Sequence, residues 1–395
     1  MSQKSPFKFL KSLTLKSLLI VSQLLPRWKK AAAIHLYPPL LSLPVARPVN
    51  FEMLTPAFGC QFISIKSIPG RKIFILKNVF VSGQAVVFKN FRIFIKSLTW
   101  ERDIQLFRDA NLFIRQFKGN YKTLDSDVFA LVYDDWSAAN YYHWMIEALP
   151  KLMLVKKAYP NARIIVPSPA PEFILATLNL LQFDNLETLG RYKLNVIKVP
   201  QLILPELVYY EQQEEDVITR KEKKLLNNDH KDTYPVELIE VVREQLVSDI
   251  IAPVTPNRKI FISRSRQKTR RLLNEEAMLG MITAYGFEIQ YFEEMSFWEQ
   301  RALMLQTSVF LSIHGSNMVN ILFLQPGSKV IELMNQEYVN DAYYLLASTI
   351  RLPYFSVPCT MQETAIINQD RVALNDADII ADEIILRTVL EMALK

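Results

Sequence analysis

Cysteine and glycine are both scarce in this 395-residue chain. The two cysteines, Cys60 and Cys359, lie far apart, so neither a disulfide framework nor a thiolate zinc site is expected. That usage is typical of a protein in a reducing compartment. Nine glycines are few for this length, so each is expected to meet a need of the backbone. Gly315 stands at the expected start of a helix, where it would let the backbone approach a ligand closely.

Several common sequence signatures are also missing. The chain contains no G-x-G-x-x-G dinucleotide motif, no G-x-x-x-x-G-K-[ST] phosphate loop and no G-x-S-x-G nucleophile turn. Its four histidines are scattered along the sequence and suggest no metal cage. We therefore predict no metal and no other cofactor, and we expect lysine and arginine to neutralise any bound phosphate.

The first 30 residues lack an uninterrupted apolar run near the ~20 residues that a membrane-spanning helix needs. In a helical projection their apolar side chains fall mainly on one side, and four lysines, Lys4, Lys8, Lys11 and Lys16, fall on the other. A basic helix of this kind would lie on an anionic membrane surface. A helix docked on the protein's own core, or a frayed tail, explains the pattern equally well. The expected location is the cytoplasm, with residues 1–30 as a candidate contact to the inner membrane face.

The length allows two buried cores, and 50% hydrophobic with 22% charged residues excludes a disordered chain. Short apolar runs that begin at Lys72 predict an antiparallel β meander. The charge-rich stretch 211–232 is either the linker between domains or an exposed insertion within one of them. The expected parts are a basic N-terminal segment and connector over 1–50, an N-terminal α/β domain over 51–232, a second α/β domain over 233–375 and a C-terminal helix over 376–395.

Residues 259–333 alternate short apolar runs with stretches of helical spacing. The runs cover 259–263, 287–291, 309–313 and 329–333. This alternation predicts parallel strands covered by helices on both faces, and hence a doubly wound α/β domain. Ligands of such sheets bind at the carboxyl ends of the strands. The loops that follow the first and third strands are therefore the candidate binding elements.

The loop after the first of these strands carries five cations, Arg264, Arg266, Lys268, Arg270 and Arg271. Guanidinium groups bind phosphate oxygens in a bidentate fashion and would stabilise a departing pyrophosphate. A solvated basic loop is the plainer interpretation. Nucleic-acid binding is the weaker alternative, because no aromatic residue within the loop could stack on a base. We accordingly expect no nucleic-acid partner.

The loop after the third strand reads His314-Gly315-Ser316-Asn317 and precedes a helical stretch. Backbone N–H groups at the start of that helix could receive phosphate oxygens. A histidine at such a position is otherwise about as often a hydrogen-bonded core residue. The presence of this loop and the basic loop at strand ends of one sheet favours a nucleotide diphosphate as ligand. Glu332, near the end of the next strand, could accept hydrogen bonds from ribose hydroxyls or be an ordinary charge at a strand end.

Asn140, His143 and Glu147 are spaced by three and four residues, which places them on one face of the helix expected over 140–156. Asn140 or Ser137 can cap that helix, which leaves His143 in its first turns as a neutral base. Glu147 could orient the imidazole or take a proton itself. A plain polar stripe along the helix remains the alternative.

Three sequence blocks together resemble glycosyltransferase family 61. They are NYYHWMIEALPKL (140–152), FISRSRQKTRRLLNEE (261–276) and HGSNMVNILFLQPGSKVIEL (314–333), and their order and spacing match over about residues 70–350. The resemblance implies a B-type glycosyltransferase fold, in which two Rossmann-like domains face each other across a cleft. It also implies a nucleotide-sugar donor in the second domain and metal-independent transfer with inversion.

The resemblance and the two loops together give a set of expected site residues. His143 and Glu147 are the expected catalytic residues. The expected donor-binding residues are Asn140, Arg264, Lys268, Arg270, Arg271, Asn274, Glu275, His314, Gly315, Ser316, Asn317, Asn320 and Glu332. Ser316 and Asn317 replace the small residues usual after His-Gly in the family, and would narrow the donor pocket or add a hydrogen bond to it.

The combined expectation is an inverting glycosyltransferase that acts on a glycan or lipid-linked glycan, in surface or capsular polysaccharide biosynthesis. In a single displacement the acceptor approaches from the side opposite the diphosphate, so the base is expected in the N-terminal domain. One alternative is a non-catalytic glycan- or nucleotide-binding protein that retains the fold. Another is an RNA-binding protein that uses the basic loop.

Overall fold

The computed structural model describes residues 32–37, 40–62, 64–68, 70–90, 92–98, 115–116, 118–125, 127–192, 194–206, 236–250, 255–361 and 371–395. The chain divides into two compact units. The first comprises Met1–Pro39, Pro69–Ile174 and Gln182–His230, and the second comprises Leu40–Ile68, Leu175–Leu181 and Lys231–Lys395. The predictions made for residues 1–30 and for the linker at 211–232 lie outside the described residues.

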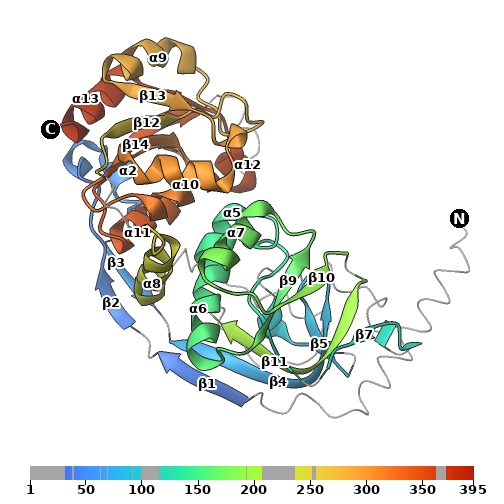
Figure 1. Cartoon of the computed structure of the whole chain (residues 1–395). Helices are drawn as coiled ribbons and strands as arrows, with labels where there is room; N and C mark the ends of the chain where they lie inside the picture. The colour runs from blue at the N-terminus through green and yellow to red at the C-terminus, as the bar shows by residue number, and fades with distance from the viewer. Residues whose placement is uncertain are drawn as a thin grey trace, which may run out of the picture. The chain divides into compact units, whose positions relative to one another are not determined.

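The first sheet has nine strands (Figure 1). The elements along this part of the chain are β1 (Ala32–Tyr37), β4 (Arg71–Ser82), β5 (Val87–Lys89), β6 (Arg92–Ile93), η2 (Ile95–Ser97), β7 (Lys122–Thr123), β8 (Val128–Leu131), α5 (Tyr141–His143), η3 (Trp144–Ala148), α6 (Leu149–Ala158), β9 (Arg163–Ser168), α7 (Glu172–Leu180), β10 (Leu186–Gly190) and β11 (Val196–Glu206).

Half of this sheet is parallel and half is antiparallel. Strands β10, β9, β8 and β11 are parallel neighbours, and their order 3-2-1-4 is that of the first four strands of a 3-2-1-4-5-6 doubly wound sheet. Beyond β11 the sheet continues through β4, β5 and β6 in antiparallel pairing, which confirms the expected meander. The meander is continuous with the parallel strands, so the first unit is mixed α/β. The strand order reverses between β8 and β11, and the helix that carries His143 follows β8.

The second unit is built on a six-stranded sheet (Figure 1). Its elements are β2 (Leu40–Pro44), η1 (Phe51–Met53), α2 (Pro56–Gly59), β3 (Ile65–Ile68), α8 (Val236–Leu246), β12 (Arg258–Ile262), α9 (Glu275–Ala284), β13 (Phe287–Gln290), η4 (Phe292–Glu294), α10 (Phe297–Leu305), β14 (Thr307–Ile313), η5 (Ser316–Phe323), β15 (Lys329–Asn335), α11 (Ala342–Thr349), β16 (Tyr354–Met361), α12 (Arg371–Asp376), β17 (Ile379–Ala381) and α13 (Glu383–Ala393).

The sheet order is β13-β12-β14-β15-β16-β17, and all pairs are parallel except the last. The four strands expected between 259 and 333 are therefore confirmed, and the parallel part has the doubly wound order 2-1-3-4-5. That order reverses between β12 and β14. Both predicted binding loops follow these two strands, so they stand at the point where doubly wound sheets bind ligands.

Helices cover both faces of this sheet. Figure 1 shows α9 and α13 on one side of the strands and α10 and α11 on the other. The core under α9 and α13 contains Ile282 and Leu390 together with Phe261, Leu311 and Ile331 from the strands, and these side chains are buried. Burial on both faces explains why these strands read as nearly continuous apolar runs.

The segment 40–68 belongs to the second unit, although the sequence analysis divided it between the connector and the N-terminal domain. The Asn50 amide donates to Ser356 O at 2.8 Å and accepts from Ser356 N at 3.1 Å. Val49 N also donates to Tyr354 O at 2.7 Å. These bonds satisfy backbone groups of β16, and such long-range pairing leaves no local signal in the sequence.

The expected helix over 376–395 is correct only from Glu383 onward. Asp382 caps it by accepting hydrogen bonds from Ile384 N and Ile385 N. Before the cap, Ile379 and its neighbours form β17, which pairs antiparallel with β16. The apolar residues that fit a helical period thus serve a strand, since pairing with β16 overrides the local pattern.

Candidate functional site

The helix after β8 begins at Asn140. The Asn140 backbone is extended, and its Oδ1 accepts hydrogen bonds from Tyr142 N at 3.0 Å and His143 N at 3.4 Å. An asparagine in this position satisfies N–H groups that a helix start leaves unpaired. The predicted cap is therefore confirmed. The donor contact expected for Asn140 stays a prediction, and its side-chain oxygen is used by the helix.

His143 and Glu147 form a pair across a π turn. Leu149 N donates to Trp144 O, five residues back, and such turns often occur at functional sites. His143 Nδ1 lies 2.8 Å from Glu147 Oε1, and both side chains are mostly buried. The second oxygen, Glu147 Oε2, is buried without a hydrogen-bond partner among the described residues. Because the carboxylate accepts from Nδ1–H, Nε2 is the basic nitrogen of the ring.

His314, at the carboxyl end of β14, is held by a second carboxylate. His314 Nδ1 lies 2.6 Å from Glu332 Oε1, and Tyr354 Oη donates to Glu332 Oε2 at 2.6 Å. Glu332 has no exposed surface, and the role predicted for it as a ribose ligand stays a prediction. Burial and the charge of Glu332 raise the pKa of Tyr354, which keeps the phenol a hydrogen-bond donor. Glu332 therefore holds His314 in its orientation.

Arg264, at the carboxyl end of β12, lies against Gly315. Its Nε and Nη2 donate to the carbonyl oxygens of Arg270 and Thr269 at 3.1 and 3.2 Å. A Cβ at Gly315 would stand 2.4 Å from Arg264 Nη1 and 3.0 Å from its Cζ. Gly315 has φ 164°, which any residue adopts, so glycine is needed here for space. The sequence predicted that a ligand would approach the backbone closely at Gly315. In the structure the group that lies close to Gly315 is the guanidinium of Arg264.

Most charges of the basic loop are already paired. Arg266 pairs with Glu294, Arg270 Nη2 lies 2.8 Å from Asp376 Oδ1, and Arg271 Nη2 lies 2.6 Å from Asp378 Oδ2. Asp376 and Asp378 are spaced as D-x-D, yet each carboxylate is bound to an arginine. Burial alone would raise the pKa of Asp378, but the hydrogen bonds and charge of Arg271 outweigh it and lower that pKa.

Two cations of the loop are not in ion pairs with the described residues. Lys268 is exposed. Arg264 is buried, and burial followed by the nearby charge of Arg270 lowers the pKa of its guanidinium. Its Nη1 has no hydrogen-bond partner among the described residues. Because most of its cations are in ion pairs, the loop attracts anions less strongly than its sequence suggests. Arg264 is the cation of the loop that hydrogen bonds hold in place without an ion pair.

Three other predicted donor ligands serve the fold. The Asn274 side chain donates to Ala381 O at 2.8 Å and accepts from Ala381 N at 3.1 Å, so it pairs with β17. Asn320 is fully buried and donates to Gln300 Oε1 at 2.9 Å. These amides complete hydrogen bonds inside the second unit, and their expected donor contacts stay predictions.

The third, Glu275, is buried at the start of α9. It accepts a hydrogen bond from Ser263 Oγ at 2.6 Å. Burial raises its pKa, although hydrogen bonds from Ser263 and Ser265 oppose the rise. These contacts tie the first turn of α9 to the end of β12. Glu275 thus stabilises the loop at Arg264 through its hydrogen bond with Ser263.

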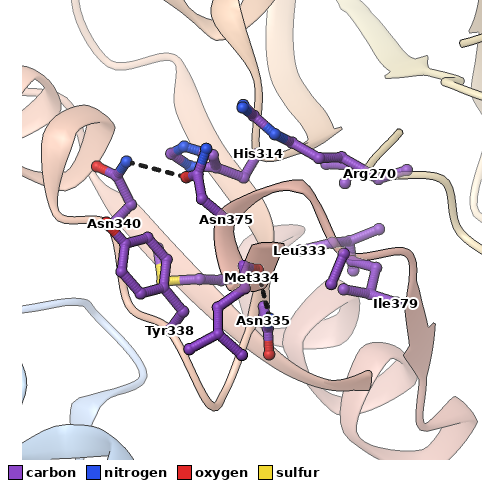
Figure 2. A pocket seen from close by; sticks show the side chains of 12 residues that line it. Arg270, His314, Leu333, Met334, Asn335, Tyr338, Asn340, Asn375 and Ile379 are labelled. Carbon is purple, nitrogen blue, oxygen red and sulfur yellow. Dashed lines mark hydrogen bonds between the residues drawn. The ribbon is translucent and has the colours of Figure 1, made fainter. Parts of the chain in front are cut away.

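A pocket opens beside His314 at the carboxyl ends of β14 and β15, and Figure 2 shows Arg270 and His314 on the same side of it. Its lining includes four polar residues that the sequence analysis missed, Asn335, Tyr338, Asn340 and Asn375. Asn335 is the last residue of β15, and Tyr338 and Asn340 follow it within five residues, so their position at a strand end was a usable signal. Asn375 comes from the C-terminal segment and no sequence pattern placed it there. Ser316 and Asn317 are half-buried at the start of η5, and their donor contacts stay predictions.

Among the residues that the structure describes, no helix is long and apolar enough to span a bilayer. Within those same ranges, no three His, Cys, Asp or Glu side chains gather as a metal ion would require. Independence from metal and contact with a membrane both stay predictions.

The sequence was compared with protein families and with curated proteins. The family model of glycosyltransferase 61 matches residues 141–331, which contain the His143 pair and both strand-end loops. A stretch of 116 residues is 33% identical to protein O-linked-mannose beta-1,4-N-acetylglucosaminyltransferase 2 of Tetraodon nigroviridis, covering 27% of this chain and 20% of that protein. A stretch of 91 residues is 32% identical to the EGF domain-specific O-linked N-acetylglucosamine transferase of Drosophila melanogaster, covering 22% of this chain and 17% of that protein. The chain thus spans about a fifth of the length of the curated relatives it matches.

Proposed function

Residues 141–331 of this chain belong to glycosyltransferase family 61, and we propose that the protein is an inverting glycosyltransferase with a nucleotide-diphosphate sugar donor. The acceptor is a hydroxyl group of a glycan or lipid-linked glycan, in surface or capsular polysaccharide biosynthesis. The sugar moved is a hexose or a pentose. The two units correspond in this proposal to the two Rossmann-like domains of the B-type fold, which the strand orders 3-2-1-4 and 2-1-3-4-5 support.

One observation carries the donor side of this proposal. Arg264 lies beside Gly315 where the strand order reverses between β12 and β14, and its Nη1 is not used by the described residues. A guanidinium held there by two carbonyl oxygens is preorganised for a diphosphate oxygen. The N–H groups at the start of η5 add further donors at the same strand ends. Lys268 supplies a further positive charge on an exposed side chain.

The first unit supplies the base. The acceptor oxygen attacks the anomeric carbon, and the bond from that carbon to the diphosphate oxygen breaks. The acceptor proton passes to His143 Nε2, and the nucleoside diphosphate leaves with the bonding electron pair. Glu147 is the positioning residue, because its contact with Nδ1 sets the tautomer and would stabilise the imidazolium that forms.

Charge on the leaving group is balanced by the cationic side chains, and we propose that no metal is required. Arg264 and Lys268 fill this role, and the two aspartates of the D-x-D tripeptide at 376–378 are bound to Arg270 and Arg271. Transfer that persists in excess chelator would support this part of the proposal. Transfer that needs added Mn²⁺ or Mg²⁺ would overturn it.

The cell location proposed is the cytoplasm, at the inner face of the membrane. The basic amphipathic pattern of residues 1–30 supports this, since each cation near an anionic surface contributes about 1 kcal/mol. Deletion of residues 1–30 should release the protein from anionic liposomes and leave transfer to a soluble acceptor in place. Equal sedimentation of both forms with such liposomes would contradict it.

The alternative is a non-catalytic glycan- or nucleotide-binding protein. A panel of nucleotide sugars, offered with glycan acceptors in chelator, separates the two by release of nucleoside diphosphate. The transferase should release it, and nuclear magnetic resonance of the product should show the opposite anomeric configuration to the donor. Saturable binding of nucleotide sugars with no release, even to water, would favour the binding protein.

A further inference from the structure

Trp136 exposes its indole beside the His143 pair. The side chain is 38% exposed, although tryptophan is mostly buried in folded proteins. The ring centroids of Trp136 and His143 lie 5.9 Å apart with the planes tilted by 58°. A partly exposed aromatic residue thus adjoins the imidazole, in the loop that leads from β8 to the helix of His143.

The loop that carries Trp136 is hydrogen-bonded at both ends. Asp134 and Ser137 are buried and bond reciprocally, with Asp134 N donating to Ser137 Oγ at 2.9 Å and Ser137 N to Asp134 Oδ1 at 2.8 Å. The Trp136 carbonyl accepts from Ala139 N at 3.0 Å and Asn140 N at 2.8 Å. Asn140 in turn caps the helix of His143. One set of hydrogen bonds therefore holds the backbone of Trp136 and of His143, and the two rings lie next to each other on it.

We propose that Trp136 is the acceptor platform, a surface on which a pyranose ring of the acceptor stacks. This inference rests on the proposed function and names the class of acceptor. The C–H groups on one face of a pyranose form a flat apolar patch, which suits the electron-rich face of an indole. A ring stacked there keeps its hydroxyls at its edge, where one of them can reach the imidazole. A serine or threonine hydroxyl of a peptide has no such face.

Polar groups beside Trp136 suit the hydroxyls of the same sugar. Asp135 precedes it and is half-buried, and Gln84 Nε2 donates to Asp135 Oδ2 at 3.3 Å. A carboxylate has further lone pairs and accepts hydroxyl hydrogen bonds well. An aromatic side chain and a carboxylate on adjacent residues combine apolar contact with a placed polar group, as small-ligand sites do.

Binding of simple glycosides to the full chain tests this proposal. The probes are methyl β-D-glucopyranoside, methyl α-D-mannopyranoside and N-acetylthreonine amide, followed by saturation-transfer nuclear magnetic resonance. At least one pyranoside should bind to the wild type, and N-acetylthreonine amide should not. Trp136→Ala should weaken pyranoside binding about tenfold, whereas Trp136→Phe, which keeps an aromatic face, should weaken it less.

The matched control is Tyr192→Ala, which removes another aromatic side chain of the first unit, 61% exposed. It should leave pyranoside binding unchanged. Equal pyranoside affinity of Trp136→Ala and the wild type would overturn the proposal, as would Trp136-dependent binding of N-acetylthreonine amide. Binding of nucleoside diphosphates to the wild type, measured in parallel, reports on the proposed function separately. If no nucleoside diphosphate binds, the pyranoside result can still be interpreted by itself.

Discussion

The imidazole of His314 is fixed by Glu332, with Nδ1 and Oε1 only 2.6 Å apart. The carboxylate has no exposed surface, and its other oxygen accepts from Tyr354 Oη. A buried carboxylate needs such partners, because an unmet charge in the protein interior is costly. Glu332 and Tyr354 thus form a buried support for the histidine at the carboxyl end of β14.

Tyr354→Phe removes one partner of the buried Glu332 carboxylate. Loss of a hydrogen bond to a buried acceptor should lower the free energy of unfolding by about 1–3 kcal/mol. Denaturant unfolding of the two proteins measures the difference. Tyr285→Phe is the matched control, since it removes an exposed hydrogen bond to Glu391, and it should cost less. Equal losses in the two variants would contradict the support assigned to Tyr354.

Gly315→Ala places a methyl group against the Arg264 guanidinium. The guanidinium must move and weaken its bonds to the carbonyls of Thr269 and Arg270, so stability should fall by about 1–3 kcal/mol. Gly280→Ala is the control, because nothing lies within 4 Å of the new Cβ. It lies within α9, where alanine should raise stability by about 0.5–1 kcal/mol. Opposite signs for the two variants are expected, and equal signs would refute the close contact.

Asp378 should contribute to stability above its ordinary pKa of 3.8. Its folded pKa is lowered, mainly by Arg271, so the contribution is present at neutral pH and is lost as pH falls through the folded value. Asp378→Asn should therefore flatten the fall in unfolding midpoint between about pH 5 and pH 2. Arg271→Met, which removes the partner, should flatten it similarly. If the unfolding midpoint falls in acid as steeply in both variants as in the wild type, the ion pair of Asp378 and Arg271 is not coupled to folding.

His143→Ala and Glu147→Gln should separate into one severe and one milder loss of turnover. A general base contributes roughly 10² to 10⁴ in rate, so His143→Ala should lose about that much. Glu147→Gln keeps a hydrogen-bond acceptor for Nδ1–H, and it should lose less and shift the pH profile of kcat. Glu187→Gln, in a surface ion pair of the same unit, is the control. A more severe loss in Glu147→Gln would make Glu147 the base.

The doubly wound second unit was predictable because its strands are buried on both faces. Their apolar runs and the helical spacing between them are local signals, and the carboxyl-end rule then placed Arg264 and His314 correctly. The capped helix at Asn140 was equally readable, since the cap and the His143–Glu147 spacing lie within eight residues of sequence.

The pairing of the basic loop was not predictable. Asp376 and Asp378 reach Arg270 and Arg271 from about 107 residues away in sequence, and Asn274 pairs with Ala381 over the same span. Five cations in one loop suggested an exposed anion site, but long-range packing neutralised most of them. The contact between Glu332 and Tyr354 was hidden for a similar reason, because nothing near Glu332 in sequence reveals Tyr354. The charges in a sequence therefore say little about which of them long-range packing pairs.

Calorimetric titration of the full chain with nucleoside diphosphates, in excess chelator, tests the donor site most directly. At least one nucleoside diphosphate should bind saturably without metal. Arg264→Lys keeps the charge but loses the planar fork, so it should bind about tenfold or more weakly, whereas the surface variant Arg387→Lys should bind as the wild type does. Failure of every nucleoside diphosphate to bind, or equal affinity of Arg264→Lys and wild type, would contradict the placement of the donor at Arg264 and Gly315.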